Sequence, residues 1–326
     1  MLFVPIDETA LPHQRRLFFA GARCDLQTNS LGLARLLEAL SVAEWRSDSS
    51  DFTMRVVVDE TRGDSAGRPH FRGLHHVVIA SFGESNIFVF DILRRTLSAH
   101  VSGAAARDYG FWKEKLIPIS LGVLGAGMGL VPVHCACLEI DGHGLLIAGA
   151  SGAGKSTLSV ALAEAGFSYI SDDWTYISEG ADGIVAHGTS APVKLLPDAV
   201  QHFRDLRRHS LKTSMNGELA YEVDIAQAFD FQTKRECAPR WLLFLERTES
   251  AEVEFTPMRS AEARNYVSSS VERLPAQLHE AAALRERTIE LVGRLPCWRF
   301  RYGGTPQFAA SQLMEFVVSR REEICA

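Results

Sequence analysis

Hydrophobic and polar positions along the first part of the chain follow the periods of both helices and strands. Leucines recur at helical spacing over residues 31–40, directly after Ser30, a residue type that favours the helix cap. Residues 55–59, 75–81 and 86–91 are rich in β-branched and aromatic side chains and predict strands. We therefore expect this part to form a small α+β domain with an antiparallel sheet.

The rest of the chain shows longer buried segments and amphipathic helices. Apolar runs at residues 145–148 and 240–246 predict strands that are covered on both faces, as in a mostly parallel sheet. Amphipathic patterns predict helices over residues 260–271, 275–295 and 306–318. This arrangement of strands and helices predicts an α/β domain.

The boundary between the two domains is expected near a helix at residues 109–124. Pro118 falls inside this helical pattern, and a proline there breaks or kinks a helix. We therefore divide the chain into an N-terminal domain at 1–117, for substrate recognition or assembly, and a second domain at 118–326.

Composition and charge exclude several classes of protein. The 326 residues are 46% hydrophobic and 23% charged, with a net charge of −6, so a nucleic-acid partner is not expected. No apolar run approaches the roughly 20 residues of a membrane span, and the first residues lack the basic start of a secretory signal. Six cysteines are scattered along the chain without zinc-site spacing. We expect a cytoplasmic protein that does not bind membranes.

One segment carries a motif with a physical mechanism. A phosphate-binding loop, with the pattern G-x-x-x-x-G-K-[ST], is matched by Gly149, Ala150, Ser151, Gly152, Ala153, Gly154, Lys155 and Ser156. The loop follows a predicted strand and precedes a predicted helix that starts at Thr157, which is the context such a loop requires. Its backbone N–H groups and the helix N-terminus form a cradle for anions.

The residue types in this loop predict ATP and Mg²⁺ as ligands. Lys155 is expected to reach the β- and γ-phosphates, and the Ser156 hydroxyl is expected to bind Mg²⁺. We assign nucleotide binding to the eight loop residues together with Thr157.

A pair of acids follows the next predicted strand, residues 167–171. Asp172 and Asp173 stand at the C-terminal end of this strand, where parallel-sheet proteins bind their ligands. A phosphotransferase needs a metal on the phosphates and a group that takes the proton of the acceptor. Two adjacent acids beside a phosphate loop are able to share these tasks.

A histidine precedes the loop on another predicted strand. His134 lies in the strand-like run 131–140, and an Asp141-Gly142 turn predicts that this run pairs antiparallel with the strand that enters the loop. This pairing is expected to bring His134 alongside the acid pair.

The order and spacing of His134, the hairpin, GASGAGKST and ISDDW resemble the catalytic domain of bacterial HPr kinase/phosphorylase. The resemblance implies a P-loop kinase domain of the HPr kinase/PEP carboxykinase-like type, joined here to the smaller N-terminal α+β domain. It also implies that Asp172 is the base toward an acceptor serine, and that Asp173 assists at His134 and the metal. The implied metal residues are Ser156 and Asp173.

One part of the family pattern is missing. HPr kinases carry a glycine- and arginine-rich segment after the acid pair, with a glutamate that binds Mg²⁺, and residues 186–203 show no equivalent. The chain therefore resembles a divergent relative of these kinases, and the resemblance does not extend to the kinase/phosphorylase signature.

These observations predict an ATP- and Mg²⁺-dependent kinase that phosphorylates a serine of a protein or of a small ribosomal peptide, for example a lasso-peptide precursor. Lys155, Asp172, Asp173 and His134 are its expected catalytic residues, and the protein can form a homo-oligomer. Two alternatives stay open: an ATP-binding regulator without catalysis, and a kinase for a small molecule such as free serine. A carboxykinase is disfavoured, because its additional metal ligands and oxaloacetate-binding arginines are not found.

Overall fold

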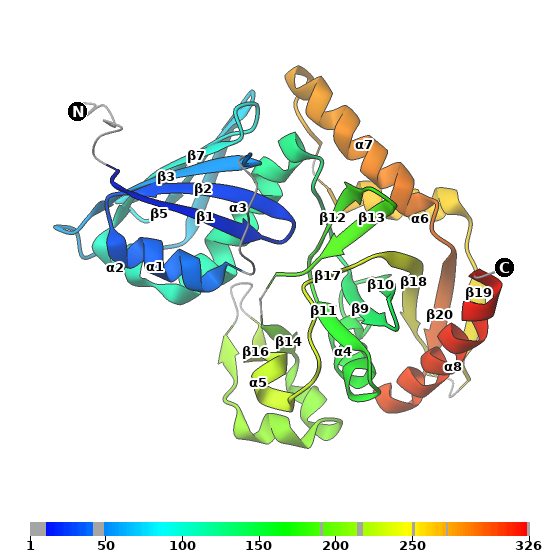
Figure 1. Cartoon of the computed structure of the whole chain (residues 1–326). Helices are drawn as coiled ribbons and strands as arrows, with labels where there is room; N and C mark the ends of the chain where they lie inside the picture. The colour runs from blue at the N-terminus through cyan, green and yellow to red at the C-terminus, as the bar shows by residue number, and fades with distance from the viewer. Residues whose placement is uncertain are drawn as a thin grey trace. The chain divides into compact units, whose positions relative to one another are not determined.

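The computed structural model describes residues 11–41, 49–189, 192–213, 218–249, 252–271 and 273–324. The chain divides into two compact units (Figure 1). Unit 1 comprises residues 1–132 and 272–288, and unit 2 comprises residues 133–271 and 289–326.

Unit 1 contains a seven-stranded sheet in the order β1-β2-β3-β7-β6-β5-β4. Its strands are β1 (His13–Phe19), β2 (Ala22–Thr28), β3 (Phe52–Asp59), β4 (Pro69–Leu74), β5 (Val77–Phe82), β6 (Asn86–Asp91) and β7 (Thr96–Ser102). The expectation of an antiparallel sheet is confirmed for β1 with β2 and for the run from β4 to β7, but it is wrong for the middle of the sheet, because β2 pairs parallel with β3, and β3 pairs parallel with β7. The helix between β2 and β3 makes this possible, since parallel neighbours need a crossover connection that strand composition does not reveal.

The helices of unit 1 begin and end for local reasons. They are α1 (Leu31–Leu40), α2 (Gly103–Arg107), the π-helical η2 (Phe111–Leu116), α3 (Ile117–Leu124) and the 3₁₀-helical η3 (Gly125–Met128). Ser30 caps α1 as expected, because its hydroxyl accepts a hydrogen bond from the Leu33 N–H at 3.3 Å. The irregularity expected at Pro118 is a change from π- to α-helix just before the proline.

The glycine-rich segment that follows α3 allows close packing. A Cβ on Gly127 would lie 2.5 Å from the carbonyl oxygen of Ile92, and a Cβ on Gly125 would lie 2.8 Å from that of Leu130. Both positions therefore require glycine, and the segment has a structural role.

Unit 2 is built around a six-stranded sheet in the order β11-β9-β10-β18-β20-β19. Its strands are β9 (Ala136–Ile140), β10 (His143–Gly149), β11 (Ser168–Ser171), β18 (Pro239–Arg247), β19 (Glu254–Pro257) and β20 (Cys297–Tyr302). Strands β10, β18 and β20 are parallel neighbours, whereas β9 runs antiparallel to both β10 and β11. Strands β10 and β11 therefore point in the same direction with β9 between them.

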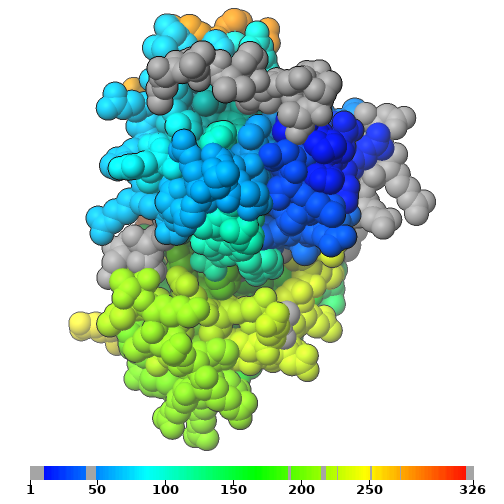
Figure 2. Space-filling model, turned by 90° about the vertical axis from the view of Figure 1, so that its left-hand side faces the viewer, coloured from blue at the N-terminus to red at the C-terminus, as the bar shows by residue number. Residues whose placement is uncertain are grey.

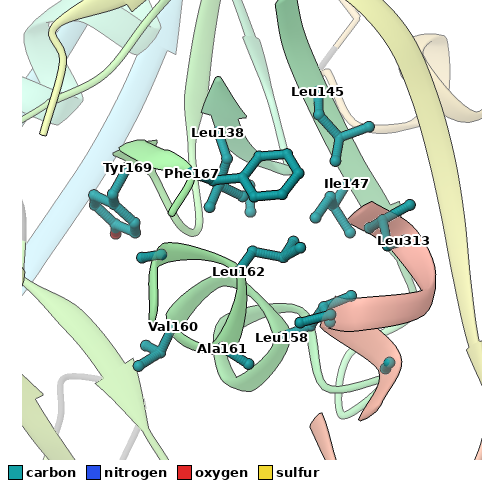
Figure 3. Packing of buried hydrophobic residues seen from close by; sticks show 14 of the residues in the cluster. Leu138, Leu145, Ile147, Leu158, Val160, Ala161, Leu162, Phe167, Tyr169 and Leu313 are labelled. Atoms are coloured by element: carbon teal, nitrogen blue, oxygen red, sulfur yellow. The ribbon is translucent and has the colours of Figure 1, made fainter. Parts of the chain in front are cut away.

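Helices cover both faces of this sheet. Helices α4 (Lys155–Glu164) and α8 (Pro306–Ile324) pack against each other (Figure 1). Phe167, Leu162 and Ile147 lie together in the core between α4 and the sheet (Figure 3). On the opposite face, the Tyr266 ring of α6 (Ser260–Ser269) meets the Phe244 ring of β18 edge to face, with 4.9 Å between centroids. Unit 2 is thus a sheet between two helical layers.

Two smaller sheets lie outside this central sheet. A four-stranded sheet in the order β17-β13-β12-β8 consists of β8 (Val131–Val133), β12 (Thr175–Gly180), β13 (Gly183–His187) and β17 (Glu236–Cys237). A small sheet is formed by β14 (Val193–Leu195), β16 (Leu219–Val223) and β15 (Lys212–Thr213). The short helices near it are η4 (Pro197–Gln201), η5 (Arg204–Arg208) and α5 (Ile225–Phe229), in the yellow-green part of the surface in Figure 2.

Two further helices complete the chain. They are η6 (Ala276–Leu278) and α7 (His279–Gly293). The structure is a mixed α/β protein with several sheets. Within the described ranges, no helix is both long enough and apolar enough to span a membrane.

Candidate functional site

The glycine-rich loop joins β10 to α4, in the order strand, loop, helix that the sequence predicts. Strand β10 ends at Gly149, and α4 begins at Lys155. Gly149 has a φ of 152° and Gly154 a φ of 92°, and both values favour glycine. A Cβ on Gly149 would also lie 2.8 Å from the carbonyl oxygen of Leu245 on the neighbouring strand. The backbone path of this loop thus depends on its glycines.

The exposed middle of the loop differs from its two ends. The side of the loop open to solvent is formed by Ala150, Ser151 and Gly152, followed by the half-buried Ala153, Gly154, Ser156 and Thr157. The Ala153 N–H donates to the carbonyl of Ala150 at 3.2 Å, which closes a tight turn. An anion that approaches the loop is therefore met by backbone and short side chains.

Lys155 is folded back over the start of the loop. Its Nζ donates to the carbonyl oxygens of Gly149 and Ala150, at 3.0 and 3.3 Å, and the residue is buried. Burial lowers the pKa of Lys155, while the nearby charges of Asp173 and Asp172 oppose this effect. The ammonium group therefore lies at the loop, bonded to carbonyls that a negatively charged ligand is able to replace.

The direction of three strands explains why the site forms at one edge of the sheet. Because β10 and β11 point the same way, the loop after Gly149 and the acids after Ser171 leave the sheet at the same edge. Strand β9 runs in the opposite direction, so the residues that precede it also lie at this edge. The topology thus brings the loop, the acid pair and His134 together.

Asp172 is the buried member of the acid pair. Burial raises the pKa of its carboxyl to about 7, against the opposing effect of a hydrogen bond from the Ser156 hydroxyl. The backbone N–H of Lys194 is a second donor to this carboxyl. Its Oδ1 atom is buried and has no hydrogen-bond partner within the described part of the chain. An acid in this state is able to take a proton near neutral pH.

Asp173 and His134 form an ion pair beside Asp172. The Nε2 atom of His134 lies 3.0 Å from Oδ1 of Asp173, and the His134 and Trp174 rings are 5.5 Å apart. Burial raises the pKa of Asp173, but the hydrogen bond and the charge of His134 outweigh it, so the net pKa is lowered. The fold therefore raises the pKa of Asp172 and lowers the pKa of the adjacent Asp173.

The local structure at His134 differs from the expected single strand over residues 131–140. His134 and Cys135 separate β8 from β9, and these two strands belong to different sheets. The hairpin prediction is confirmed: β9 and β10 pair antiparallel across Asp141 and Gly142, which both have positive φ. The break at His134 leaves its backbone free of the strand ladder.

The residues present fit a magnesium ion that is bound together with phosphate oxygens. Among the described residues, no group of three or more His, Cys, Asp and Glu side chains is suited to hold a metal by itself. Mg²⁺ commonly binds proteins through one or two side chains and takes its other ligands from phosphates and water. The Ser156 hydroxyl and the negatively charged Asp173 meet that requirement, and the unpartnered oxygen of Asp172 stays available to take a proton.

Arg247 and Arg301 belong to no sequence motif, and the structure gives them different contacts. The Arg247 guanidinium stacks over the Tyr302 ring at 5.7 Å and donates to the Gly304 carbonyl at 3.4 Å. Its Nη1 would lie 3.8 Å from a Cβ on Gly154, so Arg247 is close to the loop. Arg301 instead pairs with Glu254 and Glu246.

One residue at the site has no signal in the sequence. The Tyr266 hydroxyl lies within hydrogen-bond distance of the Gly149 N–H, the Gly149 carbonyl and the His134 carbonyl. A tyrosine on an amphipathic helix belongs to no motif, and its partners are 117 and 132 residues away in the sequence.

Comparison with known proteins identifies no close relative. No protein-family model matches the chain, and no curated protein sequence matches it. Among solved structures, the HPr(Ser) kinase/phosphatase from Coxiella burnetii is 11% identical, and the match covers 60% of this chain and 94% of that one. Its TM-score of 0.33 is too low to define the fold of this chain.

Proposed function

We propose that this protein is an ATP- and Mg²⁺-dependent phosphotransferase that acts on a serine hydroxyl of a protein or small peptide. The observation that carries the proposal is the state of Asp172. Its carboxyl is buried, has one unpartnered oxygen and a pKa raised to about 7, and is bonded to Ser156 of the glycine-rich loop. A base in this state beside an anion-binding loop suits the activation of a hydroxyl for phosphoryl transfer.

Each residue of the site has a task in this proposal. The loop N–H groups from Gly149 to Ser156, with Thr157 behind them, bind the phosphates, and Lys155 exchanges its carbonyl partners for phosphate oxygens. Ser156 holds the metal, and Asp173 supports it while orienting His134. The bound Mg²⁺ neutralises charge on the phosphates and aligns them.

ATP is a substrate in this reaction, and the transfer step balances in atoms and charge. The serine oxygen forms a bond to the γ-phosphorus while the bond from that phosphorus to the β-γ bridging oxygen breaks. The proton of the serine hydroxyl passes to Asp172, and ADP leaves with the electron pair of the broken bond. Asp172 then returns the proton to water, which a pKa of about 7 permits near neutral pH.

The motif resemblance to HPr kinases supports the same assignment, in a divergent member that lacks the downstream glutamate segment. The N-terminal domain, residues 1–117 in this proposal, is left for recognition of the acceptor or for assembly of a homo-oligomer. The kinase domain comprises residues 118–326, and the expected compartment is the cytoplasm.

Transfer of label from γ-labelled ATP tests the proposal against its alternatives. Purified protein is incubated with Mg²⁺, labelled ATP and either candidate serine peptides or free serine, and the labelled products are separated by size. Label on a peptide supports the proposal, whereas label on free serine assigns a small-molecule kinase. Tight ATP binding without transfer to any acceptor would leave a non-catalytic regulator as the conclusion.

A further inference from the structure

The strand ladder between β9 and β10 ends at Ile147 and Ala136, two residues before Gly149 and two residues after His134. The pairing His143↔Ile140 through Ile147↔Ala136 has a constant register, and continuing it would place Gly149 opposite His134. Paired residues at such a position of an antiparallel ladder exchange N–H···O=C bonds directly. Here the Tyr266 hydroxyl takes that place.

The hydroxyl bridges the two backbone segments. The Gly149 N–H donates to the Tyr266 oxygen at 3.3 Å, and the Tyr266 O–H reaches the His134 carbonyl at 3.2 Å. A ladder bond from Gly149 to His134 is thus replaced by a two-step relay through a side chain. The relay holds the end of β10 and the residue before β9 in register while keeping them apart.

The Tyr266 ring is held in place by packing against β18. The ring packs edge to face on Phe244, with 4.9 Å between ring centroids and an interplanar angle of 88°. The backbone carbonyl of Tyr266 accepts bonds from the hydroxyls of Ser269 and Ser270 at 2.7 and 3.1 Å. Burial raises the pKa of the phenol, so the hydroxyl keeps its proton at neutral pH.

The single phenolic proton has two acceptors. The Gly149 carbonyl lies 3.3 Å from the Tyr266 hydroxyl, almost as close as the His134 carbonyl at 3.2 Å. A hydroxyl donates one proton at a time, whereas a carbonyl oxygen accepts two bonds. In this structure Lys155 gives the Gly149 carbonyl a charged donor at 3.0 Å, whereas Tyr266 is the one side-chain donor found for the His134 carbonyl among the described residues, so the phenolic proton is assigned to His134.

We propose that Tyr266 is a positioning residue that couples the arrival of nucleotide phosphates at Lys155 to the backbone of His134. The inference rests on the proposed function, because it requires Lys155 to leave the Gly149 carbonyl for a phosphate. The Tyr266 O–H then turns to Gly149 and releases the carbonyl of His134. The segment that carries the His134–Asp173 pair is thereby freed to adjust when nucleotide is bound.

The Tyr266→Phe variant removes this proton and retains the ring on Phe244. Without it, the buried Gly149 carbonyl loses its last side-chain donor when Lys155 moves to a phosphate. Loss of one hydrogen bond corresponds to about 2- to 13-fold in an equilibrium constant. Binding of Mg²⁺-ATP is expected to weaken by a factor in this range. Tyr109→Phe, at a tyrosine that is 49% exposed in unit 1, is the matched control and is expected to bind like the wild type.

Carbonyl ¹³C NMR of histidine-labelled protein tests the relay directly, with His134 assigned by its loss in His134→Gln. Before nucleotide is added, the His134 carbonyl resonance is expected to differ between the wild type and Tyr266→Phe. Identical resonances would show that the bridge is absent and would overturn the inference whether or not ATP binds.

The second part of the NMR experiment repeats the comparison with saturating Mg²⁺-ATP. The His134 carbonyl resonance is expected to move in the wild type toward its position in Tyr266→Phe, and to stay in place in the variant. A bound nucleotide that leaves the wild-type resonance unchanged would overturn the coupling. Failure of ATP to bind the wild type would refute the proposed function and, with it, the coupling, while the first arm still decides whether the bridge exists.

Discussion

The imidazole of His134 and the carboxylate of Asp173 lie 3.0 Å apart, although one precedes β9 and the other follows β11. This pairing has a consequence for Asp172. Because Asp173 is charged and engaged with His134, its negative charge adds to the effect of burial and disfavours ionisation of Asp172. The ion pair thus helps to keep the neighbouring acid protonated until near neutral pH, where a base for a hydroxyl is useful.

The first prediction separates the role of Asp172 in catalysis from a role in binding. Asp172→Asn retains the shape and the bond from Ser156 but cannot take a proton. Phosphoryl transfer is expected to fall by about 10²- to 10⁴-fold, the usual contribution of a general base. Calorimetric binding of Mg²⁺-ATP should stay close to wild type. If binding is lost as well, Asp172 is a metal or structural residue.

The second prediction concerns stability against pH. An aspartate in the unfolded chain has a pKa of about 3.9, while burial raises the pKa of folded Asp172 to about 7. Between these values the folded protein holds a proton that the unfolded chain has released, so this group's contribution to stability falls as pH rises from about 4 to about 7. Asp172→Asn cannot ionise and so avoids this loss of stability. The variant is expected to be more stable than wild type above pH 7, by about 4 kcal/mol at most.

Thermal unfolding of both proteins between pH 4 and pH 8 checks this expectation. The difference between the variant and the wild type should grow through the window and level off above it. Asp173→Asn is the control: the pKa of Asp173 is lowered in the folded state, so its contribution to stability is already present above about pH 4, and the variant is expected to be less stable by a nearly constant difference across the window. A gain in Asp172→Asn that does not change with pH would contradict the assigned burial effect.

The third prediction concerns Ser156. Its hydroxyl donates to Asp172 and lowers the pKa of that carboxyl, so Ser156→Ala should move the rising limb of the pH–rate profile above its wild-type position near about 7. The same variant should need more Mg²⁺ for half-maximal transfer, whereas Ser156→Thr should restore both properties. Chelation of Mg²⁺ should abolish transfer in all three proteins. An unchanged pH profile in Ser156→Ala would show that Ser156 does not influence the pKa of the base.

The fourth prediction compares two glycines of the loop. Gly149 and Gly152 both have positive φ, at 152° and 79°, so alanine at either position is strained. A Cβ on Gly152 meets nothing within 4 Å, whereas a Cβ on Gly149 would lie 2.8 Å from the Leu245 carbonyl oxygen. Gly149→Ala is therefore expected to lower the thermal unfolding midpoint more than Gly152→Ala does. Equal effects would mean that β18 moves away easily at this point.

The parts of the site that follow from short-range rules could be predicted from the sequence. The loop between β10 and α4, the turn at Asp141 and Gly142, and the position of the acids at a strand end each depend on residues near one another in the chain. The approach of His134 to the acids followed from the hairpin and is observed.

The parts that depend on distant residues could not be predicted. The direction of β3 in the sheet of unit 1 is set by its parallel partners β2 and β7, and strand composition carries no information on direction. The place of Tyr266 depends on how α6 packs on the central sheet, and half-buried tyrosines are common on amphipathic helices. The division of residues 131–140 between two sheets likewise results from tertiary pairing, because both halves read as strand.

The antiparallel course of β9 also defines a part of unit 2 that the site does not use. The turn at Asp141 and Gly142 closes the hairpin at the edge of the sheet opposite the glycine-rich loop, and β10 has seven residues between them. A strand of this length spans about 20 Å at 3.3 Å per residue. A fluorescent reporter or a short inserted tag at this turn is therefore separated from the bound phosphates by the length of a strand. Such a label is suited to following nucleotide binding without contacting the nucleotide.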